Sequence, residues 1–188
     1  MNERSNGFTL LEVVVAMALL VMAFGGLIGL LILTQESKVN GKNNMIATYL
    51  AQEGLDIVRS VRDENYAEGP LSDPQPVDVF KEIFDDTGAP YSFTIDYTGD
   101  TSIAVQPTGM AVKNSPPLTL FNNFFMYSAD PVATSTIFHR LITTTYYPSA
   151  VPPYLEVTSQ VYWQFDNKQN TVTLKDELTA WRLSDEDL

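Results

Sequence analysis

The chain has 188 residues, a formal net charge of −12 at pH 7 and no cysteine. Without cysteine it can form no disulfide, no cysteine-based zinc site and no thiol nucleophile. The acidic charge disfavours nonspecific binding of nucleic acid, because such binding depends on basic side chains that displace counterions from phosphates. We therefore expect no direct nucleic-acid binding, and the length suits one folded domain plus an anchor.

The N-terminal part of the chain contains a long apolar run. Residues 13–33 are 21 consecutive residues without a charged or strongly polar side chain. As a helix they span roughly 31 Å, which is about the thickness of the hydrocarbon core of a bilayer. The apolar core of a cleaved secretory signal is shorter, about 7–15 residues, and no small-x-small cleavage site follows Leu33. We expect a membrane-spanning helix here.

One carboxylate, Glu12, lies at the N-terminal edge of this apolar run. A plain membrane anchor explains the length of the run but not this residue. A carboxylate at the edge of a membrane span is costly, so it indicates a function or a partner. The helix dipole lowers that cost, because it favours negative charge at the helix N-terminus.

The stretch Gly7-Phe8-Thr9-Leu10-Leu11-Glu12, together with the apolar run behind it, resembles the N-terminus of the type IV prepilin family of pilins and pseudopilins. The resemblance implies that prepilin peptidase, a membrane aspartyl protease, cuts between Gly7 and Phe8 and methylates the new amine of Phe8. It also implies that Glu12 neutralises the N-terminal amine of a neighbouring subunit in a filament. Such pairing has a physical reason, because an unpaired charge in an apolar core costs far more than a paired one.

Three features depart from the pattern that many pilins share. Gly29 stands where many pilins have a proline, the leader is weakly basic because Glu3 offsets Arg4, and no cysteine pair lies near the C-terminus. These departures leave the kind of pilin open. The glycines Gly25, Gly26 and Gly29 have two alternative interpretations: a helix-packing face, or a flexible point, since each glycine weakens a helix by roughly 1 kcal/mol.

The resemblance implies a structural subunit and not an enzyme: a minor pilin or pseudopilin of a type IV pilus or a type II secretion-like filament. The expected partners are prepilin peptidase, other pilin or pseudopilin subunits, the inner-membrane assembly machinery and, before assembly, the lipid bilayer. The expected location is the cytoplasmic (inner) membrane, crossed once with the body outside the cytoplasm, and then a cell-surface or periplasmic filament. The alternative is a membrane-anchored or filament-tip binding module, for adhesion or cargo recognition, with the same anchor.

The helical pattern continues beyond the apolar run and becomes amphipathic. No proline lies between Phe8 and Tyr66, so we predict one helix of about 55 residues. Its apolar stripe is expected to consist of Val39, Ile46, Tyr49, Leu50, Ile57 and Val61. The predicted segments are a leader at 1–7, a transmembrane or filament-core helix at 8–33, an amphipathic continuation at 34–66 and an extracytoplasmic β-rich body at 67–188.

The body contains alternating apolar and polar residues that are typical of strands. Residues 155–165 are the clearest case, because Leu155, Val157 and Val161 share one face with two aromatic residues. The other predictions are a hairpin of 91–97 with 101–106, extended segments at 118–127 and 136–147, a turn at 166–170, and a strand from 171 to about 183 with an irregularity near 176–177. The fold class is therefore α+β and pilin-like, with the long N-terminal helix packed on a mostly antiparallel sheet.

No constellation of residues indicates catalysis, a cofactor or a metal. His139 is the one histidine, and no nucleophile or orienting group accompanies it in the sequence. The acidic residues Asp85, Asp86, Asp96 and Asp100 match no calcium loop, so turn and surface roles are favoured over calcium binding. Arg59 and Arg62 are favoured as a solvated helix end over a docking site. Six aromatic residues are expected in the core rather than on a binding face: Phe121, Phe124, Phe125, Tyr127, Tyr146 and Tyr147.

Overall fold

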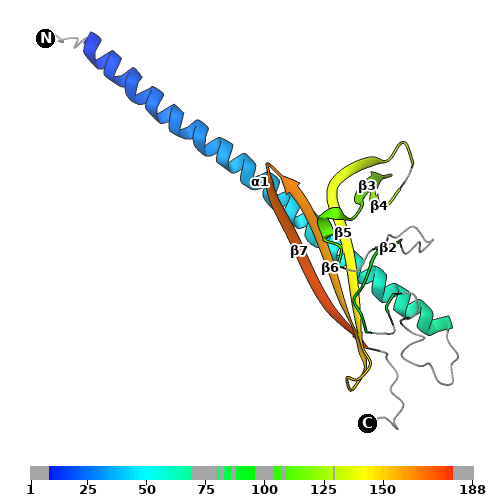
Figure 1. Ribbon diagram of the computed structural model, residues 1–188. Helices are drawn as coiled ribbons and strands as arrows, with labels where there is room; N and C mark the ends of the chain where they lie inside the picture. Colours follow the sequence, from blue (N-terminus) through cyan, green and yellow to red (C-terminus); the bar gives the residue numbers. More distant parts are fainter. Residues whose placement is uncertain are drawn as a thin grey trace. The chain divides into compact units, whose positions relative to one another are not determined.

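The computed structural model describes residues 9–68, 80, 83–85, 88–95, 104–106, 109–128 and 130–179. The chain divides into two compact units, residues 1–43 and 44–188. Helix α1, Leu10–Glu68, runs without a break through both units (Figure 1). The predicted single long helix is confirmed, whereas residues 1–8 lie outside the described residues.

In the first unit, the described residues form the N-terminal part of α1. Its large apolar side chains between Leu10 and Leu33 are all exposed, from 46% for Val13 to 84% for Leu10. This helix is long and apolar enough to cross a membrane by length and composition. An apolar surface of this size needs lipid or other apolar helices around it.

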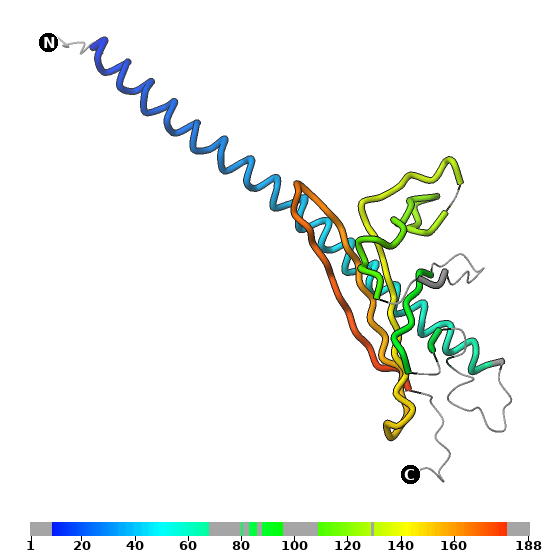
Figure 2. Tube along the Cα trace, viewed as in Figure 1, coloured from blue at the N-terminus to red at the C-terminus, as the bar shows by residue number. Residues whose placement is uncertain are grey.

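The second unit contains a seven-stranded sheet in which every pairing is antiparallel. Strand β5 is its centre: β6 pairs along one edge, while β1 and β3 share the other edge (Figure 2). Strand β7 continues the sheet beyond β6, and β2 and β4 extend it beyond β1 and β3. The strands are β1 Tyr91–Thr94, β2 Ala104–Gln106, β3 Pro117–Phe121, β4 Phe124–Met126, β5 Thr134–Tyr147, β6 Tyr154–Phe165 and β7 Lys168–Thr179, and a short 3-10 helix, η1, spans Val112–Asn114.

The part of α1 in the second unit covers one face of this sheet. Side chains of α1 and of the strands form two buried clusters, one that includes Val58 and Val157 and one that includes Leu50 and Trp163. Along β6, alternate residues from Leu155 to Trp163 are buried, which confirms the predicted apolar face of 155–165. Burial of each large apolar side chain among them stabilises the fold by roughly 1.5–3 kcal/mol.

Helix α1 approaches the sheet most closely at Gly54. A Cβ atom at this position would lie 2.6 Å from Oγ of Ser159 and 3.2 Å from Cδ of Arg140. Glycine weakens a helix interior by about 1 kcal/mol relative to alanine. At Gly54 the missing side chain instead allows the helix backbone to lie directly against β5 and β6.

The space beside Gly54 is filled by Arg140, which is fully buried on β5. Its guanidinium donates hydrogen bonds to the carbonyl oxygens of Leu50, at 3.2 Å, and Ile95, at 2.6 Å. Glu53 Oε1 lies 3.5 Å from the same group. Arg140 therefore connects α1, β5 and the end of β1 inside the core.

Three predicted features of the body are wrong. Residues 118–127 are not one extended segment, because Asn122 and Asn123 have φ of 50° and 68° and turn the chain between β3 and β4. Strand β7 pairs with β6 without interruption through residues 176–177. The turn predicted at 166–170 is tighter, since β7 already begins at Lys168.

Some side chains predicted in the core are exposed. Phe124 is 68% and Tyr147 is 39% exposed, although Tyr146 is buried as expected. On α1, Tyr49 is 64% and Val39 is 38% exposed, so the predicted apolar stripe is wrong at these two positions. The helix contacts the sheet through small residues as well as large ones, and this turns Tyr49 away from the core.

We expect the substitution Gly54→Ala to lower the free energy of unfolding by about 1–2 kcal/mol, because the new methyl group overlaps Ser159. Gly41→Ala is the matched control: a Cβ there meets nothing within 4 Å, so the better helix propensity of alanine should raise the free energy of unfolding by up to about 1 kcal/mol. Chemical denaturation of the full chain in detergent measures both. Adding Ser159→Ala to Gly54→Ala should restore part of the loss. Equal stability of the two glycine variants would contradict the close packing.

Candidate functional site

The first turn of α1 is capped by the residue before it. The backbone N–H of Glu12 donates to Oγ1 of Thr9 at 3.3 Å and to the carbonyl oxygen of Thr9 at 3.1 Å. Thr9 is therefore the N-cap residue, and Glu12 occupies the third helical position. Our sequence interpretation missed Thr9, although the spacing Thr-x-x-Glu is the signature of a capping box.

Glu12 is an exposed carboxylate in this first turn. It is the one acidic residue between Thr9 and Leu33, and among the described residues it makes no ion pair. The helix N-terminus carries a partial positive charge, which is complementary to an acidic side chain in the first turn. Its oxygens remain available to a cation outside the described part of the chain. Gly7 and Phe8, the predicted cleavage and methylation residues, lie outside the described residues.

The glycines at 25, 26 and 29 are all helical, and an added Cβ at any of them meets nothing within 4 Å. The described contacts therefore do not require glycine at these positions. Packing against another helix and local flexibility both remain predictions.

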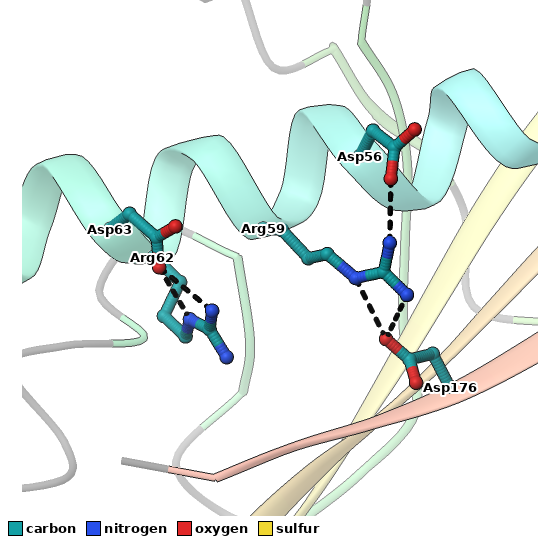
Figure 3. A network of polar contacts seen from close by, with 5 residues as sticks. All are labelled: Asp56, Arg59, Arg62, Asp63 and Asp176. Atoms are coloured by element: carbon teal, nitrogen blue, oxygen red, sulfur yellow. Dashed lines mark hydrogen bonds and ion pairs between the residues drawn. The ribbon is translucent and has the colours of Figure 1, made fainter. Parts of the chain in front are cut away.

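The two arginines near the end of α1 lie in ion pairs within the second unit (Figure 3). Arg59 donates to Oδ2 of Asp176 on β7 through Nε, at 3.0 Å, and Nη2, at 2.8 Å, and to Oδ1 of Asp56 at 2.6 Å. The hydrogen bonds to Asp176 raise the pKa of Arg59, while partial burial opposes the rise. Arg62 pairs with Asp63 at 2.8 Å. The Arg59–Asp176 pair fastens the helix to the edge strand β7, and because Arg59 is 43% exposed it contributes about 1 kcal/mol or less. The pairs of Arg59 with Asp56 and of Arg62 with Asp63 lie within α1.

His139 lies half-buried on β5, and its Nδ1 lies 2.5 Å from the carbonyl oxygen of Ser115. Among the described residues no three His, Cys, Asp or Glu side chains form a group that could hold a metal ion. Of the four acidic residues weighed for calcium, Asp85 is described, and Asp86, Asp96 and Asp100 lie outside the described residues. We therefore take the first turn of α1, with Glu12, as the candidate functional site.

The comparison with protein families finds the prokaryotic N-terminal methylation motif at residues 3–33. This is the type IV prepilin-like signature, and the resemblance stated above is confirmed for this segment. The matched segment contains Gly7, Phe8, Glu12 and the apolar run. No curated protein and no solved structure matches the chain significantly. The signature is that of structural prepilin-like proteins, not of enzymes, and the α+β fold agrees with a pilin-like arrangement.

We expect Thr9→Ala to loosen the first turn of α1, since loss of an N-cap hydroxyl costs about 1 kcal/mol. Amide exchange at Glu12 in detergent micelles should then become about fivefold faster. Thr9→Ser is the control, because serine keeps the acceptor oxygen and should leave the exchange unchanged. Equal exchange in all three proteins would show that the cap does not hold this turn.

Proposed function

We propose that this protein is a structural subunit, a minor pilin or pseudopilin, of a type IV pilus or a type II secretion-like filament. In this proposal prepilin peptidase cuts after Gly7, and Phe8 becomes the N-methylated first residue. The observation that carries the proposal is the methylation motif at residues 3–33, joined to an exposed apolar helix with one carboxylate in its first turn.

The exposed apolar surface of α1 suits two environments in turn, first the lipid bilayer and then the core of a filament. Before assembly, lipid covers residues 8–33; in a filament, the apolar helices of neighbouring subunits replace the lipid. The exchange requires no new chemistry, because both environments are apolar. In this scheme residues 1–7 are the removed leader, 34–66 continue the helix, and 67–188 form the body outside the cytoplasm.

Glu12 gives the proposed filament a defined register. Cleavage before Phe8 creates an amine, which is largely protonated near neutral pH. This amine and the Glu12 carboxylate lie four residues apart at the same end of the helix. Pairing with the amine of a neighbour therefore fixes the axial offset between two helices. In an apolar core, the loss of one partner leaves an uncompensated charge that costs several kcal/mol.

The proposal favours a minor subunit over the major one. The chain has no cysteine, and therefore no C-terminal cysteine pair of the kind that many major pilins have. The prolines and glycines of its body also predict loops, at 69–76 and 107–117. Inner-membrane assembly proteins and other pilin-like subunits are the proposed partners, and the copy number in purified filaments distinguishes a minor from a major subunit.

Processing is tested first by intact mass and N-terminal sequencing of the protein from its native host. We expect a mature chain that begins at Phe8 and carries one additional methyl group on its amine. An uncut chain in cells with active prepilin peptidase would reject the proposal and leave a membrane-anchored β-rich domain.

The role of Glu12 is tested by Glu12→Gln and Glu12→Ala. We expect both variants to insert into the membrane and to be processed, but to enter filaments about tenfold less than wild type, because the amine of the neighbour loses its partner. Glu36→Gln is the matched control: it removes the same charge from an exposed position on α1 beyond the apolar run. Immunoblots of sheared filaments and of membranes give the ratio. Normal incorporation of both Glu12 variants would contradict this role.

A further inference from the structure

We propose that the second unit binds an acidic saccharide, a sugar that bears a carboxylate, on the face of the sheet opposite α1. A hollow of about 520 Å³ lies there, lined by residues of η1, β5, β6 and β7. We call it the outer-face hollow. Its volume is within the range of small-molecule sites, roughly 300–1,000 Å³. Nothing in the N-terminal motif bears on it, so it is independent of the proposed filament role.

Strand alternation places the hollow on the outer face. Phe138, Val161 and Trp163 belong to the buried cluster under α1. Because successive side chains of a strand point to opposite faces, their neighbours His139 and Tyr162 lie on the other face. The floor of the hollow is therefore built on strands, which hold side chains more rigidly than loops do.

The floor has a defined hydrogen-bonding state. His139 and Tyr162 are paired across β5 and β6, with their ring centroids 5.9 Å apart and the rings inclined at 63°. Nδ1 of His139 lies 2.5 Å from the carbonyl oxygen of Ser115. A carbonyl oxygen only accepts, so Nδ1 carries a hydrogen and donates to it. The floor thus presents the second ring nitrogen of His139 beside the hydroxyl group of Tyr162, which donates to Oε1 of Gln164 at 3.4 Å.

The walls carry primary amides. Asn114, Gln164 and Gln169 line the hollow, and all three are exposed. Asn114 and Gln169 can each donate and accept, while Gln164, whose Oε1 accepts from the Tyr162 hydroxyl group at 3.4 Å, offers its amide hydrogens. Such groups match the donor and acceptor character of sugar hydroxyl groups. Ile137, 45% exposed, supplies an apolar surface for the C–H groups of a sugar ring. A peptide site needs several apolar anchor pockets, and the described lining offers this one apolar side chain.

The charge of the lining selects an anionic sugar. Lys113 is an exposed cation in the lining, and the lining residues described include no carboxylate. The chain as a whole carries a net charge of −12, so this is a local reversal of its charge. A lysine ammonium forms strong, charge-assisted hydrogen bonds with a carboxylate. A uronic acid offers such a carboxylate together with the hydroxyl groups that the amides suit.

His139 provides the test, because it is the one histidine in the chain and gives a single imidazole signal. The full chain, labelled with ¹³C-histidine and held in detergent micelles, is titrated with glucuronate, glucose, acetate and inorganic phosphate. We expect a saturable shift with glucuronate and about tenfold weaker binding of glucose, which lacks the carboxylate. Acetate and phosphate should give no saturable shift. The absence of a shift with glucuronate, or equal shifts with acetate or phosphate, would overturn the proposal.

Variants then locate the binding. Lys113→Gln should weaken glucuronate binding about tenfold and leave glucose binding unchanged. Lys175→Gln removes a cation from β7 outside the hollow, where it pairs with Glu156 at 3.3 Å, and should change neither. Gln169→Ala should weaken both sugars alike. An equal effect of Lys113→Gln and Lys175→Gln would attribute the shift to general electrostatics and reject the site. Thermal unfolding of each variant verifies that it is folded.

Discussion

The contact between α1 and the sheet depends on one buried cation. An arginine cannot lose its charge in a protein interior, so Arg140 is tolerable only where oxygen atoms surround its guanidinium. The carbonyl oxygens of Leu50 and Ile95 provide these acceptors from two different elements, with Glu53 close by. Because both carbonyl groups must face the same guanidinium, α1 can neither slide nor rotate on the sheet without leaving the charge unsatisfied. The absent side chain of Gly54 is the second half of the constraint, since a Cβ there would overlap the side chain of Ser159 and crowd that of Arg140.

A single helix therefore meets two kinds of environment, and its sequence changes accordingly. In the second unit it presents small residues, Ala47, Ala51 and Gly54, toward the sheet, with larger apolar residues beside them. In the first unit its apolar side chains surround the whole helix, which is the pattern of a helix meant to be enclosed on all sides. A one-sided stripe suits a sheet, and an all-round apolar surface suits lipid or a ring of other helices. Removal of apolar surface from water stabilises both parts of the helix, but the part in the first unit needs a partner outside the described residues.

The features that were predicted correctly from the sequence are those that a local residue pattern encodes. The length of α1, the alternation in β6 and the motif at residues 3–33 can each be read from one continuous segment of the chain, and they are confirmed. The helix surface that contacts the sheet was only partly predicted, because hydrophobicity placed Tyr49 in the stripe whereas the packing selects the smaller Ala47 and Ala51. The hairpin between β3 and β4 was missed because Asn122-Asn123 is a weaker turn signal than Asn-Gly. Arg140 was not foreseen, because a buried charge depends on carbonyl groups 45 and 90 residues away. At the start of α1 the capping role of Thr9 was readable from its spacing to Glu12 and was overlooked.

The start of α1 and the outer-face hollow would bind their partners through different kinds of interaction. At the start of α1 a lone carboxylate in an apolar setting favours one oppositely charged partner strongly, and so encodes a position in an assembly. In the outer-face hollow, one lysine and the amides of η1, β6 and β7 gain little from any single contact, and so favour a ligand that engages several of them together. A face of the sheet that α1 leaves uncovered can carry such a ligand without disturbing Arg140 or the helix. In the proposed filament, where other helices would enclose the apolar part of α1, the outer face is the surface on which recognition can vary while the fold and the anchor stay constant.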